Sequence, residues 1–144
     1  MINNVDLDLL EKTYQNASVG ITAIEAVLDK VKNQQFSNDL HRQLRDYQEI
    51  ADKSKRQLRM NGAKAKDVSF YNKAVMKSNV KLNTLRDSSD SHIAQMVIRG
   101  STMGVTQMTK LLHAKKNADG TSAKIAEEFV KKEENNIEVM KHYL

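Results

Sequence analysis

The sequence predicts an all-α protein that folds as one domain over residues 1–144. Its 144 residues contain no proline, only five glycines and 5% aromatic side chains, a composition that suits long helices and lacks what sheets need. Apolar side chains also recur in alternating steps of four and three residues, which is the spacing of a helix face that packs on other helices.

The first two helices are the clearest. The first is expected to begin near Asp6, a candidate N-cap. Its apolar seam contains Leu10, Tyr14, Ala17, Ile21, Ile24, Leu28 and Val31. The second is expected to begin at the cap residue Ser37 and to end at Asn61-Gly62, a common left-handed stop. Its seam contains Leu40, Leu44, Tyr47, Ala51, Ser54 and Leu58. The short connection predicts that the two helices are antiparallel neighbours.

A long crossover and two further helices follow. The residues after Gly62 are too periodic for a plain loop and predict a short crossover helix capped by Ser69. The residues that make it amphipathic are Phe70, Ala74 or Tyr71, Val75, Ser78 and Leu82. A third long helix is expected from about Asp87 to His113. Its seam contains Ser91, Ala94, Ile98, Ser101, Val105, Met108 and Leu112. A turn and cap at 119–122 should then start the last helix.

The last helix has a carboxylate in its apolar seam. The apolar members of that seam are Ala126, Val130, Ile137, Met140 and Leu144. Glu133 interrupts them and should point inward. A carboxylate in such a place must be paired, hydrogen-bonded, metal-bound or neutral. Glu133 is therefore the first candidate for a functional residue.

The two halves of the sequence resemble each other. The segment SVGITAIEAVL from Ser18 aligns with TMGVTQMTKLL from Thr102 at an offset of 84 residues, which places Gly20 on Gly104. At an offset of 86, the seam of the second helix falls on that of the last helix, with Tyr47 on Glu133. This echo favours two similar hairpins in a four-helix bundle with pseudo-twofold symmetry, and chance similarity between helical seams is the alternative.

Two hairpins, a long crossover and the terminal segment FVKKEENNIEVMKHYL resemble the ferritin-like superfamily. More narrowly, the chain is similar to the small, mostly uncharacterised ferritin-like-domain proteins of low-GC Gram-positive bacteria. The resemblance implies an up-down four-helix bundle with a long crossover carrying a short extra helix. Di-iron members of the superfamily hold their metals with one Glu from each of two helices and a Glu-x-x-His from each of the other two.

This sequence keeps few of those ligands. In the last helix the Glu-x-x-His pattern falls on Glu133 and Asn136, so the histidine is replaced by an amide. In the second helix the matching positions are Tyr47 and Ile50, which keep neither ligand. The resemblance therefore implies a degenerate di-metal site, without bound cofactor and without ferroxidase or oxygenase activity.

On the first and third helices the family's single carboxylates match Glu11 and Gln95, and only Glu11 can carry a charge. The remnants of the metal site are thus Glu11, Glu133 and Asn136. Three alternatives stay open for Glu133: a remnant metal ligand, a buried carboxyl held by Tyr14, Tyr47 or Gln95, or a side chain exposed by a shift of the seam.

Basic residues gather in the middle of the chain. Between Lys53 and Arg86 there are ten basic residues against one acid, a net charge of +9 in a chain whose formal charge is +5. The residues expected to form one basic surface at one end of the bundle are Lys55, Arg59, Lys64, Lys66, Lys73, Lys77 and Lys81. A solvated face is the plainer interpretation, because specific nucleic-acid recognition also needs interleaved aromatic side chains; an anionic ligand or nucleic acid is the alternative.

The third helix carries a second apolar stripe beside its seam. It consists of Ile93, Met96, Val97, Gly100 and Met103. Either the crossover helix covers this stripe within the monomer or a second copy covers it in a homodimer.

No complete catalytic, phosphate-binding or metal motif occurs, and no apolar segment is long enough to cross a membrane or to act as a signal peptide. We therefore expect a cytoplasmic, non-catalytic bundle with a structural or partner-binding role, whose protein partner is unknown. The alternatives are a metal-binding or redox protein that uses Glu133 and Glu11, and a binder of anionic ligands through the basic surface.

Overall fold

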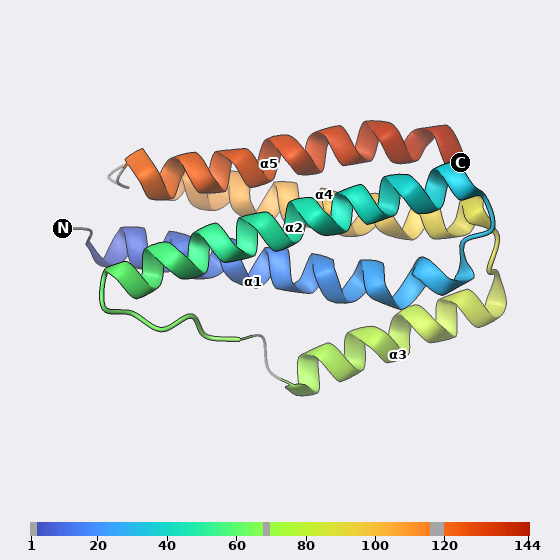
Figure 1. Cartoon of the computed structure of the whole chain (residues 1–144), viewed down its shortest axis with the longest axis horizontal. Coiled ribbons are helices and arrows are strands. Elements are labelled where there is room, and N and C mark those ends of the chain that lie inside the picture. The colour runs from blue at the N-terminus through green and yellow to red at the C-terminus, as the bar shows by residue number, and fades with distance from the viewer. Residues whose placement is uncertain (1–2, 68–69, 116–119) are drawn as a thin grey trace.

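The structure, a computed structural model, describes residues 3–67, 70–115 and 120–144, and these form a bundle of four long helices with a fifth helix on its side (Figure 1). The long helices are α1 (Asn4–Val27), α2 (Gln34–Met60), α4 (Asp90–Ala114) and α5 (Gly120–Met140), and α3 (Phe70–Arg86) lies in the crossover. Single 3₁₀ turns follow α1 (Leu28–Lys30) and α5 (Lys141–Tyr143). The predicted all-α four-helix bundle with a crossover helix is confirmed.

Two antiparallel hairpins make up the bundle: α1 packs mainly on α2, and α4 packs mainly on α5. The crossover returns from the end of α2 along the side of α1, and α3 then packs on α1 (Figure 1). The crossover therefore runs along one side of the bundle.

Polar side chains set the helix boundaries. The N-cap of α1 is Asn3, and Asp6 is the third helical residue, whose carboxylate accepts a hydrogen bond from the backbone N–H of Asn3 in a capping box. The N-cap of α2 is Asn33, so Ser37 lies inside the helix. Both predicted caps were therefore wrong. Gly62 has φ of 75°, in agreement with the predicted left-handed stop.

The later boundaries also moved. The α4 helix begins at Asp90 with Ser89 as its cap, three residues after the predicted start at Asp87. The α5 helix ends at Met140, and the expected seam residue Leu144 is exposed. Two predicted cap or turn residues, Ser69 and Asp119, lie outside the described residues. The same holds for the side chains of the predicted crossover seam: Phe70, Tyr71, Ala74, Val75, Ser78 and Leu82.

The core runs along the bundle axis, and side-chain contacts join the helices near both of its ends. Its largest fully buried side chains include Phe36, Phe129, Leu9, Leu40, Ile93 and Met108. At one end the Ser122 hydroxyl donates to Asp6 at 2.7 Å, which joins α5 to α1. Near the other end, the ring of Tyr143 stacks on Phe36. The hairpins are thus held in one register, and this register places the polar residues described next.

Among the described residues, no helix combines the length and the apolar character that crossing a membrane requires.

Candidate functional site: a buried polar cluster beside a cavity

Glu133 of α5 is buried at the centre of the bundle, with 3% of its surface exposed. The Tyr47 hydroxyl of α2 donates a hydrogen bond to its Oε1 atom at 2.5 Å. Longer bonds reach the same oxygen from the hydroxyl of Ser101, at 3.4 Å, and from the side-chain amide of Asn136, at 3.5 Å. The prediction of an inward Glu133 held by Tyr47 is confirmed.

Gln43 extends this cluster. It is completely buried one turn before Tyr47 on α2, so the two side chains share a face. Its amide nitrogen donates to the Tyr47 hydroxyl at 2.8 Å and reaches the Ser101 hydroxyl at 3.4 Å. Its carbonyl oxygen is buried and has no hydrogen-bond partner in the described part of the chain. Gln43 was not predicted from the sequence, where its only signal is the i, i+4 spacing from Tyr47.

Two glycines make room for the cluster. A Cβ atom at Gly20 of α1 would lie 2.7 Å from the ring of Tyr47, closer than such carbon atoms can approach. A Cβ atom at Gly104 of α4 would lie 3.1 Å from Oε2 of Glu133. Each hairpin therefore packs a glycine of its first helix against the polar residue of its second helix. The predicted symmetry between the halves appears here as matched packing.

Burial sets the electrostatics of the cluster. Loss of hydration raises the pKa of Glu133 to about 7, although hydrogen bonds from Tyr47, Asn136 and Ser101 act in the opposite direction. Burial, and then the nearby charge of Glu133, raise the pKa of Tyr47 well above its usual value. Near neutral pH the carboxyl group of Glu133 is therefore partly protonated. The phenol of Tyr47 keeps its proton and remains a hydrogen-bond donor.

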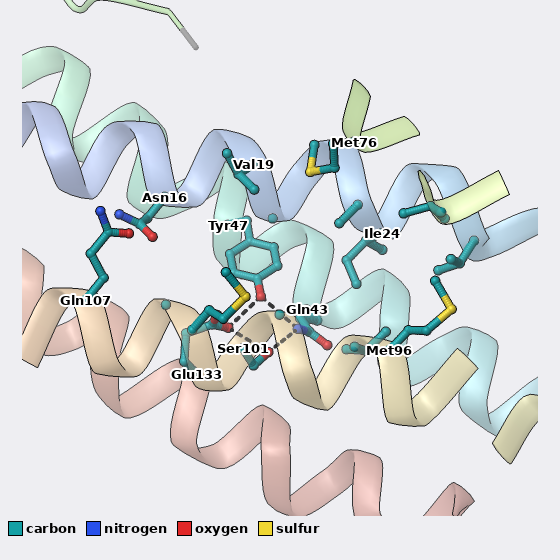
Figure 2. A pocket seen from close by; sticks show the side chains of 18 of the residues that line it. Asn16, Val19, Ile24, Gln43, Tyr47, Met76, Met96, Ser101, Gln107 and Glu133 are labelled. Atoms are coloured by element: carbon teal, nitrogen blue, oxygen red, sulfur yellow. Dashed lines mark hydrogen bonds between the residues drawn. The ribbon is translucent and has the colours of Figure 1, made fainter. Parts of the chain in front are cut away.

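A cavity of about 630 Å³ opens beside the cluster, between α1 and α4, and α3 contributes one of its walls. Glu133, Tyr47, Gln43 and Ser101 lie at its inner side (Figure 2). Amide side chains also line it, of which Asn16 of α1 and Gln107 of α4 point toward one another in Figure 2. The remaining lining is mainly aliphatic and methionine side chains.

The structure brings together two of the three predicted metal-site remnants. Asn136 lies beside Glu133, but Glu11 lines a separate cavity formed with the segment 63–67. The residue of α1 that packs against Tyr47 of the cluster is Gly20. Glu11 lies nine residues before Gly20, which is about 13 Å along a helix. Within the described residues, no group of three or more His, Cys, Asp or Glu side chains is placed to hold a metal ion.

The other predicted partners of Glu133 lie elsewhere. Tyr14 donates its hydroxyl to Asp67 of the crossover at 2.6 Å, and so fastens the crossover to α1. Gln95 is exposed. The interpretations that relied on Tyr14 or Gln95 as partners of Glu133 were wrong.

The second apolar stripe of α4 is divided between the core and the cavity. Ile93 is fully buried in the core. Met96 and Val97 are half-buried and line the cavity together with Gly100 and Met103, the last of which is 73% exposed. Described residues of α3, among them Met76, line the same cavity. The stripe therefore faces the crossover helix across an open space.

The predicted basic residues lie along the molecule. Six of the seven are exposed, and Lys73 is half-buried. Lys55 and Arg59 belong to the last turns of α2, near the N-terminal end of the chain, whereas Lys81 lies on α3, which runs toward the opposite end (Figure 1). These residues are thus spread along the length of the bundle and are not gathered at one end of it.

Comparison with known proteins bears on the fold. No protein-family model and no curated protein matches the chain. A solved structure of a DUF305 fragment from Deinococcus radiodurans is similar, with a TM-score of 0.76 and 11% identity, over 98% of this chain and 95% of that one. The E. coli stress protein YciF is similar with a TM-score of 0.70 and 13% identity, over 99% of this chain and 93% of that one. The chain therefore has a helical bundle fold of the ferritin-like type.

Proposed function

We propose that this chain is a non-catalytic member of the ferritin-like fold, in which a hydrogen-bonded polar cluster replaces the di-metal site and which acts as a binding module. The observation that carries the proposal is the surroundings of Glu133. Its neighbours Tyr47, Ser101 and Asn136 are all uncharged hydrogen-bond donors. Donors of this kind hold a carboxyl group in place without any metal ion.

The donor set does not fit a di-metal centre. Iron and manganese pairs need several carboxylates and imidazoles at one place, and at least one carboxylate must bridge the two ions. Among the described residues that line the cavity, Glu133 is the only carboxylate, and no histidine accompanies it. The alternative of a redox protein that uses Glu133 and Glu11 is disfavoured, because the two side chains line separate cavities.

Metal analysis tests this proposal. Protein purified without chelator is expected to contain less than stoichiometric iron and manganese by mass spectrometry, and titration with Fe²⁺ under anaerobic conditions should show no saturable binding. Glu134→Ala, on the exposed neighbouring position, is the matched control for Glu133→Ala. One or more metal ions per chain, retained in Glu134→Ala and lost in Glu133→Ala, would contradict the proposal.

The proposal also covers the relatives, the cellular location and the partners of the protein. We place it among the small ferritin-like-domain proteins of low-GC Gram-positive bacteria, in the cytoplasm, with an as yet unidentified protein partner. A homodimer through the exposed side of α4 is also proposed, because Met103 is a large apolar side chain with 73% of its surface exposed. Light scattering coupled to size-exclusion chromatography tests the dimer, and Met103→Glu should convert it to a monomer.

A further inference from the structure

The cavity beside Glu133 has the size and the walls of a small-molecule site. Its volume of about 630 Å³ falls within the range of about 300 to 1,000 Å³ that ligand pockets occupy. Val19, Ile24, Met76 and Met96 line it and lie on different sides of the space in Figure 2. Methionine side chains are flexible and polarisable, so these walls suit an apolar group of adaptable shape.

Its inner side presents one hydrogen-bond acceptor that no described residue uses. All hydrogen bonds that reach Glu133 from described residues end on Oε1. The other oxygen, Oε2, faces Gly104, which has no side chain to cover it and which also lines the cavity. The carbonyl oxygen of Gln43 also lacks a partner among the described residues, but that atom is buried and out of reach of a ligand in the cavity. A carboxyl oxygen without a partner in such a site is unfavourable, so a ligand that donates to Oε2 gains affinity.

The described lining of the cavity carries only negative charge. Glu133 is the only charged residue among its described lining residues: α1, α3 and α4 contribute no charged side chain there, and α2 contributes the phenol of Tyr47. From outside the lining, Asp46 of α2 also acts on Glu133, but Lys132 pairs with Asp46 at 3.5 Å. No lysine or arginine of the described lining neutralises Glu133. A ligand with a positive charge would do so, and an ammonium group offers three hydrogen-bond donors, one of which serves Oε2.

We propose that this cavity binds a small primary amine with an apolar body, whose ammonium group contacts Oε2 of Glu133. The apolar body lies against the methionine and aliphatic walls. This inference rests on the proposed function, because it requires that Glu133 be free of metal.

The test compares three probes that share one chain length. The probes n-octylamine, 1-octanol and octanoate are titrated by calorimetry into protein that has been treated with chelator and dialysed. At about pH 8 octylamine is expected to bind at least about tenfold more tightly than octanol, because hydrogen bonds to a charged partner are the stronger ones. Octanoate is expected to bind most weakly, since it adds a further carboxylate beside Glu133.

Two variants locate the site. Glu133→Gln keeps the shape of the side chain and removes its charge, so octylamine affinity should fall about tenfold while octanol affinity stays the same. Glu134→Gln, on the exposed neighbouring position, is the matched control and should change neither. Gly100→Leu adds a side chain at a cavity-lining position with open space, and should weaken both probes without disturbing the fold.

The dependence on pH gives an independent check. Since burial raises the pKa of Glu133 to about 7, octylamine affinity should fall about tenfold between about pH 8 and about pH 6 as the carboxylate gains its proton. The same change of pH should leave octylamine binding to Glu133→Gln unaltered, because the amide does not titrate.

Four results would overturn the inference: no saturable binding of octylamine, equal binding of octylamine and octanol at about pH 8, unchanged octylamine affinity in Glu133→Gln, or unchanged affinity of both probes in Gly100→Leu. Failure here is distinct from failure of the proposed function. A stoichiometric metal that is lost in Glu133→Ala contradicts the proposed function. Metal-free protein that does not bind octylamine contradicts only the assignment of the ligand.

Discussion

Tyr47 and Glu133 occupy matching positions of the two hairpins, 86 residues apart, and the hydroxyl of the first donates to the carboxylate of the second at 2.5 Å. In a symmetric di-metal bundle both positions would hold carboxylates, which need cations between them. Here a phenol takes one place, so a neutral donor meets an acceptor and the pair needs no ion. The donor of Tyr47 and the acceptor of Glu133 thus account for the polar centre of this bundle.

The first prediction concerns the pH dependence of stability. Burial raises the pKa of Glu133 to about 7 in the folded state, above its ordinary value of 4.5. The folded protein therefore holds this proton more tightly than the unfolded chain. The resulting stability is fully present below about pH 4.5 and is lost as the pH rises through about 7. The full shift corresponds to roughly 3 kcal/mol, an order-of-magnitude figure.

Glu133→Gln removes this titration. We expect the variant to match the wild type near pH 5 and to exceed it in unfolding free energy at about pH 8, by up to roughly 3 kcal/mol. Urea unfolding at both pH values measures the difference, with Glu134→Gln as the control that should follow the wild type. A Glu133→Gln variant that is less stable than the wild type at pH 8 would show that the buried carboxylate is net stabilising.

The second prediction concerns the junction between the start of α4 and the loop that joins α1 to α2. The carboxylate of Asp90, in the first turn of α4, accepts hydrogen bonds from the backbone N–H groups of Lys32 and Asn33, both at 2.9 Å. Asp90→Ala should lower the free energy of unfolding by about 1 to 2 kcal/mol, because it removes two bonds to a charged acceptor and a favourable charge at the helix start.

Hydrogen exchange gives a local measurement of this contact. The amides of Lys32 and Asn33 should exchange faster in Asp90→Ala than in the wild type. Ser91→Ala, at an exposed neighbouring position, is the control and should change neither the exchange nor the stability by more than a few tenths of a kcal/mol. Equal exchange in all three proteins would mean that the contact does not persist in solution.

Much of the architecture could be predicted from spacing alone. Most of the predicted seam of α2 was correct: Leu44 is half-buried, and the other five residues are buried, namely Leu40, Tyr47, Ala51, Ser54 and Leu58. The inward position of Glu133 followed from the same reasoning. Steps of four and three fix which face of a helix is buried, and an interrupted seam reveals a buried polar residue.

Which of two adjacent faces of α5 is buried could not be predicted. In α5 the buried neighbours of Glu133 are Phe129 and Asn136, whereas the predicted seam residues Val130 and Ile137 are only half-buried. Adjacent positions on a helix differ by about 100° of rotation, so two neighbouring seams fit one sequence about equally well. The contribution of Gln43 and the cavity itself depend on how α1, α3 and α4 pack, which local patterns do not determine.

The third prediction concerns the basic residues of α3. Lys73, Lys77 and Lys81 recur every four residues and share a face of the helix. We expect no measurable binding of duplex DNA at ~50 mM salt, because a lysine face without interleaved aromatic side chains mainly favours solubility. Fluorescence anisotropy with a labelled duplex measures this. Binding with a log-log salt slope near about −3.6, lost when the three lysines are replaced by glutamate, would instead support the nucleic-acid alternative.

The fourth prediction concerns the close contact between α1 and Tyr47. A Cβ atom at Gly20 would lie 2.7 Å from the tyrosine ring, which is 5% exposed and held by hydrogen bonds. Gly20→Ala should therefore lower the free energy of unfolding by about 1 to 3 kcal/mol, despite the better helix propensity of alanine. Gly100→Ala, at a helical position with open space, is the matched control and should raise it by up to about 1 kcal/mol.

A double-mutant cycle decides whether the tyrosine ring causes the cost at Gly20. In a Tyr47→Leu background the ring is absent, so the further change Gly20→Ala should cost little or become stabilising. If Gly20→Ala is equally destabilising with and without the ring, the close contact with Tyr47 is not its cause. If the cost of Gly20→Ala disappears in the Tyr47→Leu background, Gly20 is required because the bundle places a phenol, and not a carboxylate, opposite Glu133.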